Sequence, residues 1–254
     1  HAILQAGTGG LAIHNARVGA LTAIGASITQ TGTASVGSRA DLVTGGDITL
    51  VDFNAGLLDA DAAAITQTGT LKVTGEADLS TSGAITLADV DAAALTATAD
   101  DTLQIAKANV TGHAALSANN TMTLGNVNAG SLTAASNALS LSTGVIDGAA
   151  NLAARGTLQL TDSLSVGGDL TATGVGINQI GTLHVDGDAT LEAGNGNLVI
   201  NNVTIGQKLA ATGAGISQSG TLQVTGLADL DSTGAVALVG VDAGELKAKA
   251  GSTL

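Results

Sequence analysis

The sequence predicts an all-β protein, a parallel β-helix solenoid of about 13–14 coils with about 18–19 residues in each coil. Three observations predict it. A repeat of 37–39 residues runs through the whole chain, short runs inside each repeat alternate apolar with polar residues, and proline is absent.

The repeat is clearest in a six-residue motif, Ile-x-Gln-x-Gly-Thr. The motif occurs at Ile28–Thr33, Ile65–Thr70, Ile177–Thr182 and, with Ser at its second position, at Ile216–Thr221. Leucines spaced 37 to 39 residues apart open the successive units: Leu21, Leu58, Leu95, Leu132, Leu170, Leu209 and Leu246. The chain is therefore expected to be one tandem array over residues 1–254.

The boundaries of this array follow from the same leucines. Residues 1–20 form a partial unit, residues 21–245 form six double-coil units, and residues 246–254 begin a further unit. Solenoids need polar capping segments at their ends, and neither end of this sequence resembles one. We expect an interior segment of a longer chain, or alternatively a subunit whose open ends stack head to tail.

Within a unit, the local pattern predicts short strands. Leu71 and Val73 alternate with Lys72 and Thr74, and the run ends at Gly75. Period-two alternation closed by glycine, asparagine, aspartate or serine is typical of strands joined by tight turns. A helical repeat would instead need a 3.6-residue period, and its helices would be weakened by so much glycine and threonine.

Composition agrees with stacked coils. Each coil pairs with the coils on either side, so nearly every backbone N–H is needed, and proline has none. Small aliphatic residues suit a narrow interior, and glycine, asparagine and aspartate suit tight corners.

Several functional classes are excluded by composition. The chain has no cysteine, so it has neither disulfides nor thiolate metal sites. With 21 acidic residues against 8 basic ones and a single aromatic ring, it lacks the charge and the stacking surface of a nucleic-acid-binding protein. The aliphatic content opposes disorder, and no apolar run is long enough to span a membrane.

The repeats resemble the shaft repeats of filamentous haemagglutinin-like adhesins. The segments that carry the likeness are Gly168-Asp-Leu-Thr-Ala-Thr-Gly174, Gly220-Thr-Leu-Gln-Val-Thr-Gly226 and Asn120-Thr-Met-Thr-Leu-Gly-Asn-Val-Asn128. The resemblance implies a right-handed β-helix, export across a Gram-negative outer membrane and display of adhesive regions on the cell surface. A chain without cysteine suits export in an unfolded state.

Close carboxylate pairs are the first candidates for chemistry, because β-helical enzymes that act on polysaccharides use such pairs. The pairs are Asp59/Asp61, Asp89/Asp91, Asp100/Asp101, Asp186/Asp188 and Asp229/Asp231. The repeat also places Asp52, Asp89 and Asn126 at equivalent positions, and likewise Asn54, Asp91, Asn128 and Asp242. We expect corner residues that bond their own backbone, with weak calcium binding at stacked corners as the alternative.

Other polar residues give weaker signals. Gln30, Gln67, Gln179 and Gln218 recur in the motif, and we expect a structural role for them rather than ligand contact. Threonine rows at Thr29/Thr31/Thr33 and Thr66/Thr68/Thr70 suggest ice binding, although the pattern is interrupted in the middle units. The histidines, His1, His14, His113 and His184, share no spacing. We therefore assign no catalytic, cofactor-binding or metal-binding residue.

The function expected from the sequence is mechanical. The leading hypothesis is a non-enzymatic structural shaft of a secreted bacterial adhesin or cell-surface filament, located outside the cell. Its partners would be further copies of the repeat, and a receptor would be reached through regions outside this segment. A self-assembling extracellular fibre subunit is the alternative, and a carbohydrate-active β-helix enzyme is a remote one.

Overall fold

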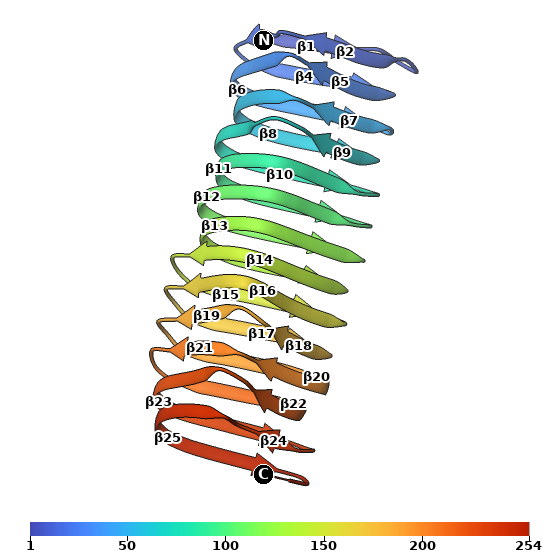
Figure 1. The fold of residues 1–254 in the computed structure, drawn as a ribbon. Coiled ribbons are helices and arrows are strands. Elements are labelled where there is room, and N and C mark those ends of the chain that lie inside the picture. The colour runs from blue at the N-terminus through green and yellow to red at the C-terminus, as the bar shows by residue number, and fades with distance from the viewer. Residues whose placement is uncertain (254) are drawn as a thin grey trace. The chain divides into compact units, whose positions relative to one another are not determined.

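The computed structural model describes residues 1–253, and every regular element in that range is a β-strand (Figure 1). The strands are parallel and stack as a β-solenoid of about 13 turns with a spacing of ~19 residues, which confirms the predicted fold class. Within the described range, no helix is present that could cross a membrane. The chain divides into two compact units, His1–Thr123 and Leu124–Leu254, and each is described by itself.

The strands of the first unit are β1 (Ala2–Gln5), β2 (Gly10–His14), β3 (Arg17–Val18), β4 (Leu21–Gly25), β5 (Ser27–Thr31), β6 (Thr33–Thr44), β7 (Asp47–Leu50), β8 (Asp52–Ala62), β9 (Ala64–Gln67), β10 (Leu71–Thr81), β11 (Ile85–Ala99) and β12 (Leu103–Ala118). Strand β13 (Thr121–Ser136) contains the boundary between the units.

The strands of the second unit are β14 (Ala138–Ile146), β15 (Ala150–Ala154), β16 (Thr157–Val166), β17 (Leu170–Gly174), β18 (Gly176–Gln179), β19 (Thr182–Val185), β20 (Ala189–Ile200), β21 (Asn202–Ile205), β22 (Leu209–Gln218), β23 (Thr221–Ser232), β24 (Val236–Ala237) and β25 (Gly240–Ala250).

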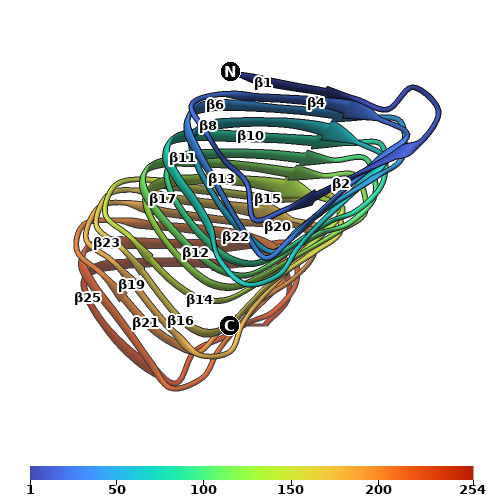
Figure 2. The same cartoon turned by 90° about the horizontal axis from the view of Figure 1, so that it is seen from above.

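Each coil has three sides. In the first unit, β4 and the later parts of β6, β8 and β10 form one side, and they run next to one another in Figure 2. Strands β5, β7 and β9 form the second side together with the start of β11. The early parts of β6, β8 and β10 form the third side, and a register shift separates them from the later parts.

Two columns of core residues explain why the sequence repeats every two coils. In the first unit, one buried column reads Leu21, Ala40, Leu58, Ala77, Leu95 and Ala114. The column beside it has the opposite phase and reads Ala23, Leu42, Ala60, Leu79, Ala97 and Leu116. Because coils are only ~4.8 Å apart, a leucine fills the space above and below an alanine. A coil with leucine in the first column and alanine in the second must therefore be followed by a coil with alanine in the first and leucine in the second.

The second unit follows the same rule. Its corresponding column reads Leu132, Ala150, Leu170, Ala189, Leu209 and Ala228, and all six residues are buried. Six of the seven leucines that mark the repeat in the sequence are therefore the large members of an alternating core column, and the seventh, Leu246, is 46% exposed.

Backbone amides are used at the corners as well as in the strands. The N–H of Ala26 donates to the carbonyl of Gly9 at 2.8 Å, and the N–H of Ala63 donates to Gly46 at 2.7 Å. The N–H of Ser38 likewise donates to Gly19 at 2.7 Å. Proline at these corners would remove a bond between coils, which accounts for its absence.

Candidate functional site

The glutamine of the repeated motif joins one coil to the next. The Gln30 side chain is fully buried. Its Nε2 donates to the carbonyl of Gly32 at 2.9 Å, and its Oε1 accepts the N–H of Val51, one coil further on, at 2.8 Å. One side chain thus closes its own turn and holds the following coil.

The other copies of this glutamine repeat the arrangement in part. Gln179 donates to Gly181 and accepts from Asn201, each at 2.7 Å, and Gln218 donates to Gly220 at 3.0 Å and accepts from Val239 at 2.9 Å. Gln67 accepts from the N–H of Ala88 at 3.0 Å, but its Nε2 is buried without a partner. All four glutamines are 0–3% exposed and bond backbone groups, so their role is structural.

Asparagine or aspartate binds the same motif from the preceding coil. The Oδ1 atoms of Asn15, Asp52 and Asn202 accept the N–H of the motif threonine, at 3.0 Å from Thr33, 3.0 Å from Thr70 and 3.2 Å from Thr221. The expected corner role is found, but the bond runs to the next coil and not to the residue's own backbone. The sequence could not show this, because it does not give the pairing of corners.

The glycine of the motif is required by this contact. Gly69 has a φ of 74°, in the left-handed region that suits glycine. A Cβ atom placed there would also lie 2.4 Å from the Oδ1 of Asp52. The motif glycine and the corner carboxylate therefore depend on each other.

A second corner of the coil carries a ladder of carboxylates in the second unit. The Oδ1 of Asp169 accepts the N–H of Asp188 at 2.9 Å, and the Oδ1 of Asp188 accepts the N–H of Lys208 at 3.0 Å. Asp186, the other member of its predicted pair, is exposed and contacts the Nε2 of His184 at 2.8 Å. The predicted pair Asp186/Asp188 is thus divided between two different tasks.

In each of the other predicted pairs, at least one carboxylate has a partner in a neighbouring coil. Lys107 Nζ lies 3.0 Å from Asp89 Oδ2, and Lys72 Nζ lies 3.8 Å from Asp91 Oδ2. Lys249 lies 3.0 Å from Asp231 Oδ2. The side-chain amides of Asn119 and Asn120 donate to Asp100 and Asp101, respectively, at 3.3 Å and 2.7 Å.

In the first unit, the equivalent positions predicted from the repeat are separated by an intervening coil. Asp52 and Asp89 are in one column, but the coil of Leu71 lies between them, because Leu71 pairs with both Phe53 and Val90. Asn54 pairs with Lys72, which in turn pairs with Asp91. In the second unit, Asn126 and Asn128 lie on β13 and Asp242 lies on β25. Within the first unit, the structure brings no two of these residues into adjacent coils.

The structure instead assembles a carboxylate column that the close pairs did not reveal. Asp41, Asp59 and Asp78 occupy successive coils in register on β6, β8 and β10. Arg39 contacts Asp41 and donates from Nη2 to Asp59 at 2.6 Å. The sequence does contain a signal for this column, because the three aspartates are 18 and 19 residues apart and each spacing is the length of one coil.

The surroundings of one carboxylate in this column shift its pKa. Partial burial, together with the nearby charges of Asp59 and Glu76, raises the pKa of Asp78 above its ordinary value. Arg39 reaches Asp41 and Asp59, and the hydrogen bond and charge of Asp41 raise the pKa of its guanidinium. Asp41 and Asp59 are half-buried and Asp78 is exposed, and none of the three lines the hollow of the second unit.

Buried hydroxyl groups form a further set of caps that the sequence analysis missed. Each binds the turn that follows it: Thr44 accepts from the N–H of Gly46, Thr81 donates to the carbonyl of Gly83, Ser136 donates to Ala138, and Ser232 donates to Ala235. In the sequence, these residues occupy an apolar phase of the alternation, where a small hydroxyl residue replaces alanine.

The histidines do not come together. His14 lies 3.0 Å from the hydroxyl of Thr31, and its Nε2 accepts from Asn15 at 2.8 Å. His184 lies in the second unit beside Asp186. Among the residues that the structure describes, no group of three or more histidine, aspartate or glutamate side chains is placed to hold a metal ion.

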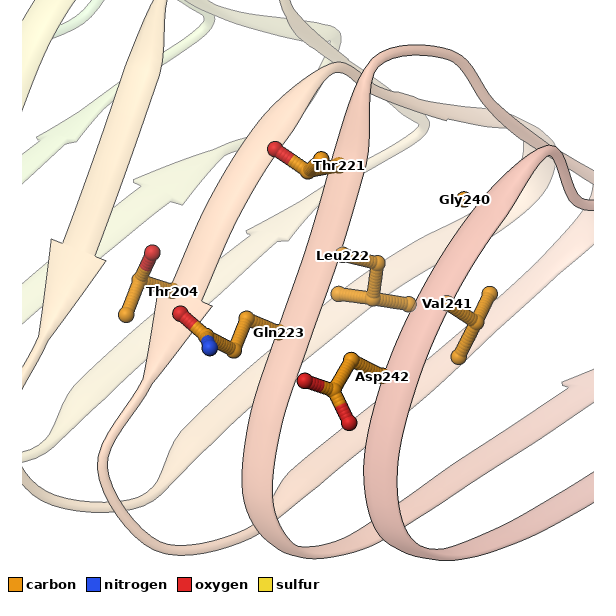
Figure 3. Close-up of a pocket in the computed structure, with 7 residues that line it drawn as sticks. All are labelled: Thr204, Thr221, Leu222, Gln223, Gly240, Val241 and Asp242. Atoms are coloured by element: carbon orange, nitrogen blue, oxygen red, sulfur yellow. The ribbon is translucent and has the colours of Figure 1, made fainter.

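A hollow of about 320 Å³ lies on the third side of the second unit (Figure 3). It is lined by Thr204, Thr221, Leu222, Gln223, Gly240, Val241 and Asp242. Thr204, Gln223 and Asp242 come from successive coils and form one outward row. The hollow offers two hydroxyls, an amide and one carboxylate, so its lining lacks the second carboxylate that paired acid–base chemistry would use.

Comparison with known proteins identifies a repeat family. A family model described as repeats of unknown function matches residues 1–54, 51–93, 148–203 and 195–242. No curated protein and no solved structure matches the chain.

Proposed function

We propose that this chain, which belongs to the family described as repeats of unknown function (DUF5649), is a non-enzymatic structural shaft of a secreted bacterial adhesin or cell-surface filament. In this proposal the chain has no reaction to catalyse. It holds adhesive regions at a distance from the cell, and its partners are further copies of the repeat and, through other regions, a surface receptor.

One observation carries the proposal: the recurring polar residues of the repeat bind the backbone of the neighbouring coil. Gln30 bonds Val51, Asp52 bonds Thr70, and Asp169 bonds Asp188. A binding or catalytic site would leave its polar groups free for a ligand, whereas these groups hold the stack together.

The direction of the hydrogen bonds and the net charge of the chain suit a mechanical role. Coil-to-coil hydrogen bonds lie parallel to the stacking direction, so a pulling force is shared among several strands at once. The formal charge of −13 also opposes random clumping of neighbouring shafts. The resemblance to haemagglutinin-like shaft repeats supports the extracellular location.

Two measurements test the proposal. Antibodies against residues 1–254 should label intact, unpermeabilised cells of the source organism. Small-angle scattering of the dilute chain should give an elongated particle, and removal of residues 58–94 should shorten it by about 9.6 Å, two coil spacings. A globular particle, or labelling only after the cells are opened, would contradict the proposal.

A further inference from the structure

The second side of the first unit carries an outward ladder without charge. Its members are in register on successive coils: Ala12, Thr29, Thr49, Thr66, Thr86 and Gln104. Four consecutive rungs, Thr29, Thr49, Thr66 and Thr86, are threonine, and the run ends at Gln104. We call these six residues the threonine ladder.

The same side of the second unit is also uncharged. Its outward residues in register are Ser140, Gln159, Asn178, Val199, Ser217 and Ala237. We call these six residues the amide ladder.

Charge is almost excluded from the strands that carry the two ladders. The chain has 21 acidic and 8 basic residues. On the second side of the first unit, Asp47 of β7 is the one charged residue, and the corresponding segments of the second unit contain none. The aspartates of the other sides, such as Asp41, Asp59 and Asp78, are stacked in columns instead.

We propose that these ladders are the surfaces on which a second copy of this chain docks side by side. Two copies that each carry a charge of −13 repel one another wherever their acidic columns meet. Repulsion is smallest where the sides with the fewest charges meet, so a second copy is directed to the ladders. This inference does not depend on the shaft function.

The chemistry of the ladders suits a partner identical to themselves. Five of the six rungs of the threonine ladder and four of the six rungs of the amide ladder are hydroxyl or amide residues. Such side chains both donate and accept hydrogen bonds, so these rungs can pair with rungs of the same kind on another copy. A charged column could not do this, because it would meet its own sign. Two-fold symmetric contacts require such self-complementary surfaces.

Two exposed aliphatic residues indicate the relative direction of the copies. Val175 and Ile180 lie immediately before and after β18, and their exposed fractions are 46% and 51%. A two-fold axis parallel to the stacking direction turns one copy so that its Val175 meets the Ile180 of the other, twice in each pair. The two copies would then run in the same direction.

The size of the surface predicts a weak association. Each ladder spans five coil steps and about four residues of strand, roughly 24 Å by 13 Å, or roughly 300 Å². A stable interface buries about 800 Å² on each partner. We therefore expect monomers at low concentration and dimers only at high concentration.

Sedimentation equilibrium over a wide range of concentration tests the proposal. The wild-type chain should approach twice its monomer mass, and its association should tighten several-fold when salt screens the repulsion between copies. Replacing Thr66, Thr86, Gln159 and Asn178 by lysine should abolish the dimer, because it places four positive charges on each copy's ladders.

A matched variant controls for the added charge. Ser80, Thr98, Thr171 and Thr190 are outward residues on the first side of the coil, arranged as two adjacent pairs in register. Replacing them by lysine adds the same four charges and should leave the dimer intact. A wild-type chain that stays monomeric at every concentration would overturn the proposal, as would equal loss of dimer in both variants.

The direction of the copies can be tested separately, because the chain has no native cysteine. A mixture of Val175→Cys and Ile180→Cys chains, treated with a short bis-maleimide at a concentration that favours dimers, should cross-link mainly between the two variants. Preferential cross-linking of each variant to itself would overturn the parallel arrangement.

Discussion

At the scale of single residues, the buried glutamine carries the most information. It occupies an apolar position of the alternation, yet the motif keeps it in four copies. The reason is that its amide group satisfies a turn carbonyl and an amide of the next coil, which leucine could not do.

The unequal contacts of two copies give a quantitative test. We expect Gln30→Leu to lower the free energy of unfolding by about 2 kcal/mol, because it leaves the N–H of Val51 and the carbonyl of Gly32 without this partner. Gln67→Leu should lower the free energy of unfolding by about 1 kcal/mol less than Gln30→Leu does, because it also removes the buried, unpartnered Nε2 of Gln67. Chemical denaturation measures both variants.

Hydrogen exchange provides the control for this comparison. The amide of Val51 should lose protection in Gln30→Leu and keep it in Gln67→Leu, and the amide of Ala88 should show the reverse. Equal loss of stability in the two variants, with no local change in exchange, would contradict the proposed coil-to-coil role.

At the scale of the coil, packing depends on the order in which leucine and alanine alternate from one coil to the next, and not on composition alone. This order is called the phase of the column. Leu58 and Ala60 lie on one coil, between Ala40 and Leu42 on the previous coil and Ala77 and Leu79 on the next. Each leucine therefore has alanines as its neighbours along the column, and the interior is filled evenly.

Exchanging the two residues tests this rule without changing the composition. The double variant Leu58→Ala, Ala60→Leu stacks three alanines in one column and three leucines in the other. We expect a loss of about 3–5 kcal/mol, because a cavity forms beside an overpacked site. Thermal unfolding followed by circular dichroism measures the loss, and a change below ~1 kcal/mol would show that the interior repacks freely.

The single variants separate the two effects. Leu58→Ala alone creates the cavity, and Ala60→Leu alone creates the crowding. If phase is what matters, each single variant should be destabilised, and the double variant should not recover the stability of the wild-type chain.

At the scale of the whole molecule, the repeat length acts as a rule of assembly. Removing residues 58–94 takes out two coils and places the coil of Leu95 and Ala97 after the coil of Ala40 and Leu42, so the alternation is kept. Removing residues 58–76 takes out one coil and places Ala77 directly after Ala40, so the alternation is broken.

We therefore expect the two deletions to behave differently. The longer deletion should leave the unfolding temperature within a few degrees of the wild-type value, and the shorter deletion should lower it markedly, although it removes fewer residues. Circular dichroism and thermal unfolding of both chains check this prediction. Equal stability of the two deletion variants would show that coils of either kind can follow one another.

Much of the fold could be predicted because it is written in local patterns. The alternation of Leu71, Lys72, Val73 and Thr74 reports strands, and the spacing of Leu21, Leu58 and Leu95 reports the period. The candidate sites were less predictable. Asp59 was paired with Asp61 in the sequence, but the two side chains occupy different columns, and Asp59 lies between Asp41 and Asp78.

The sequence by itself determined the fold class, the two-coil period and the demand for backbone hydrogen bonding, because each of these repeats along the chain. Only the tertiary structure decided which side chains lie in one column, which corner carboxylate meets which amide, and which side of the coil carries almost no charge. The physical reason is that neighbours in this fold are 17 to 22 residues apart, and the varying corners between them set the register.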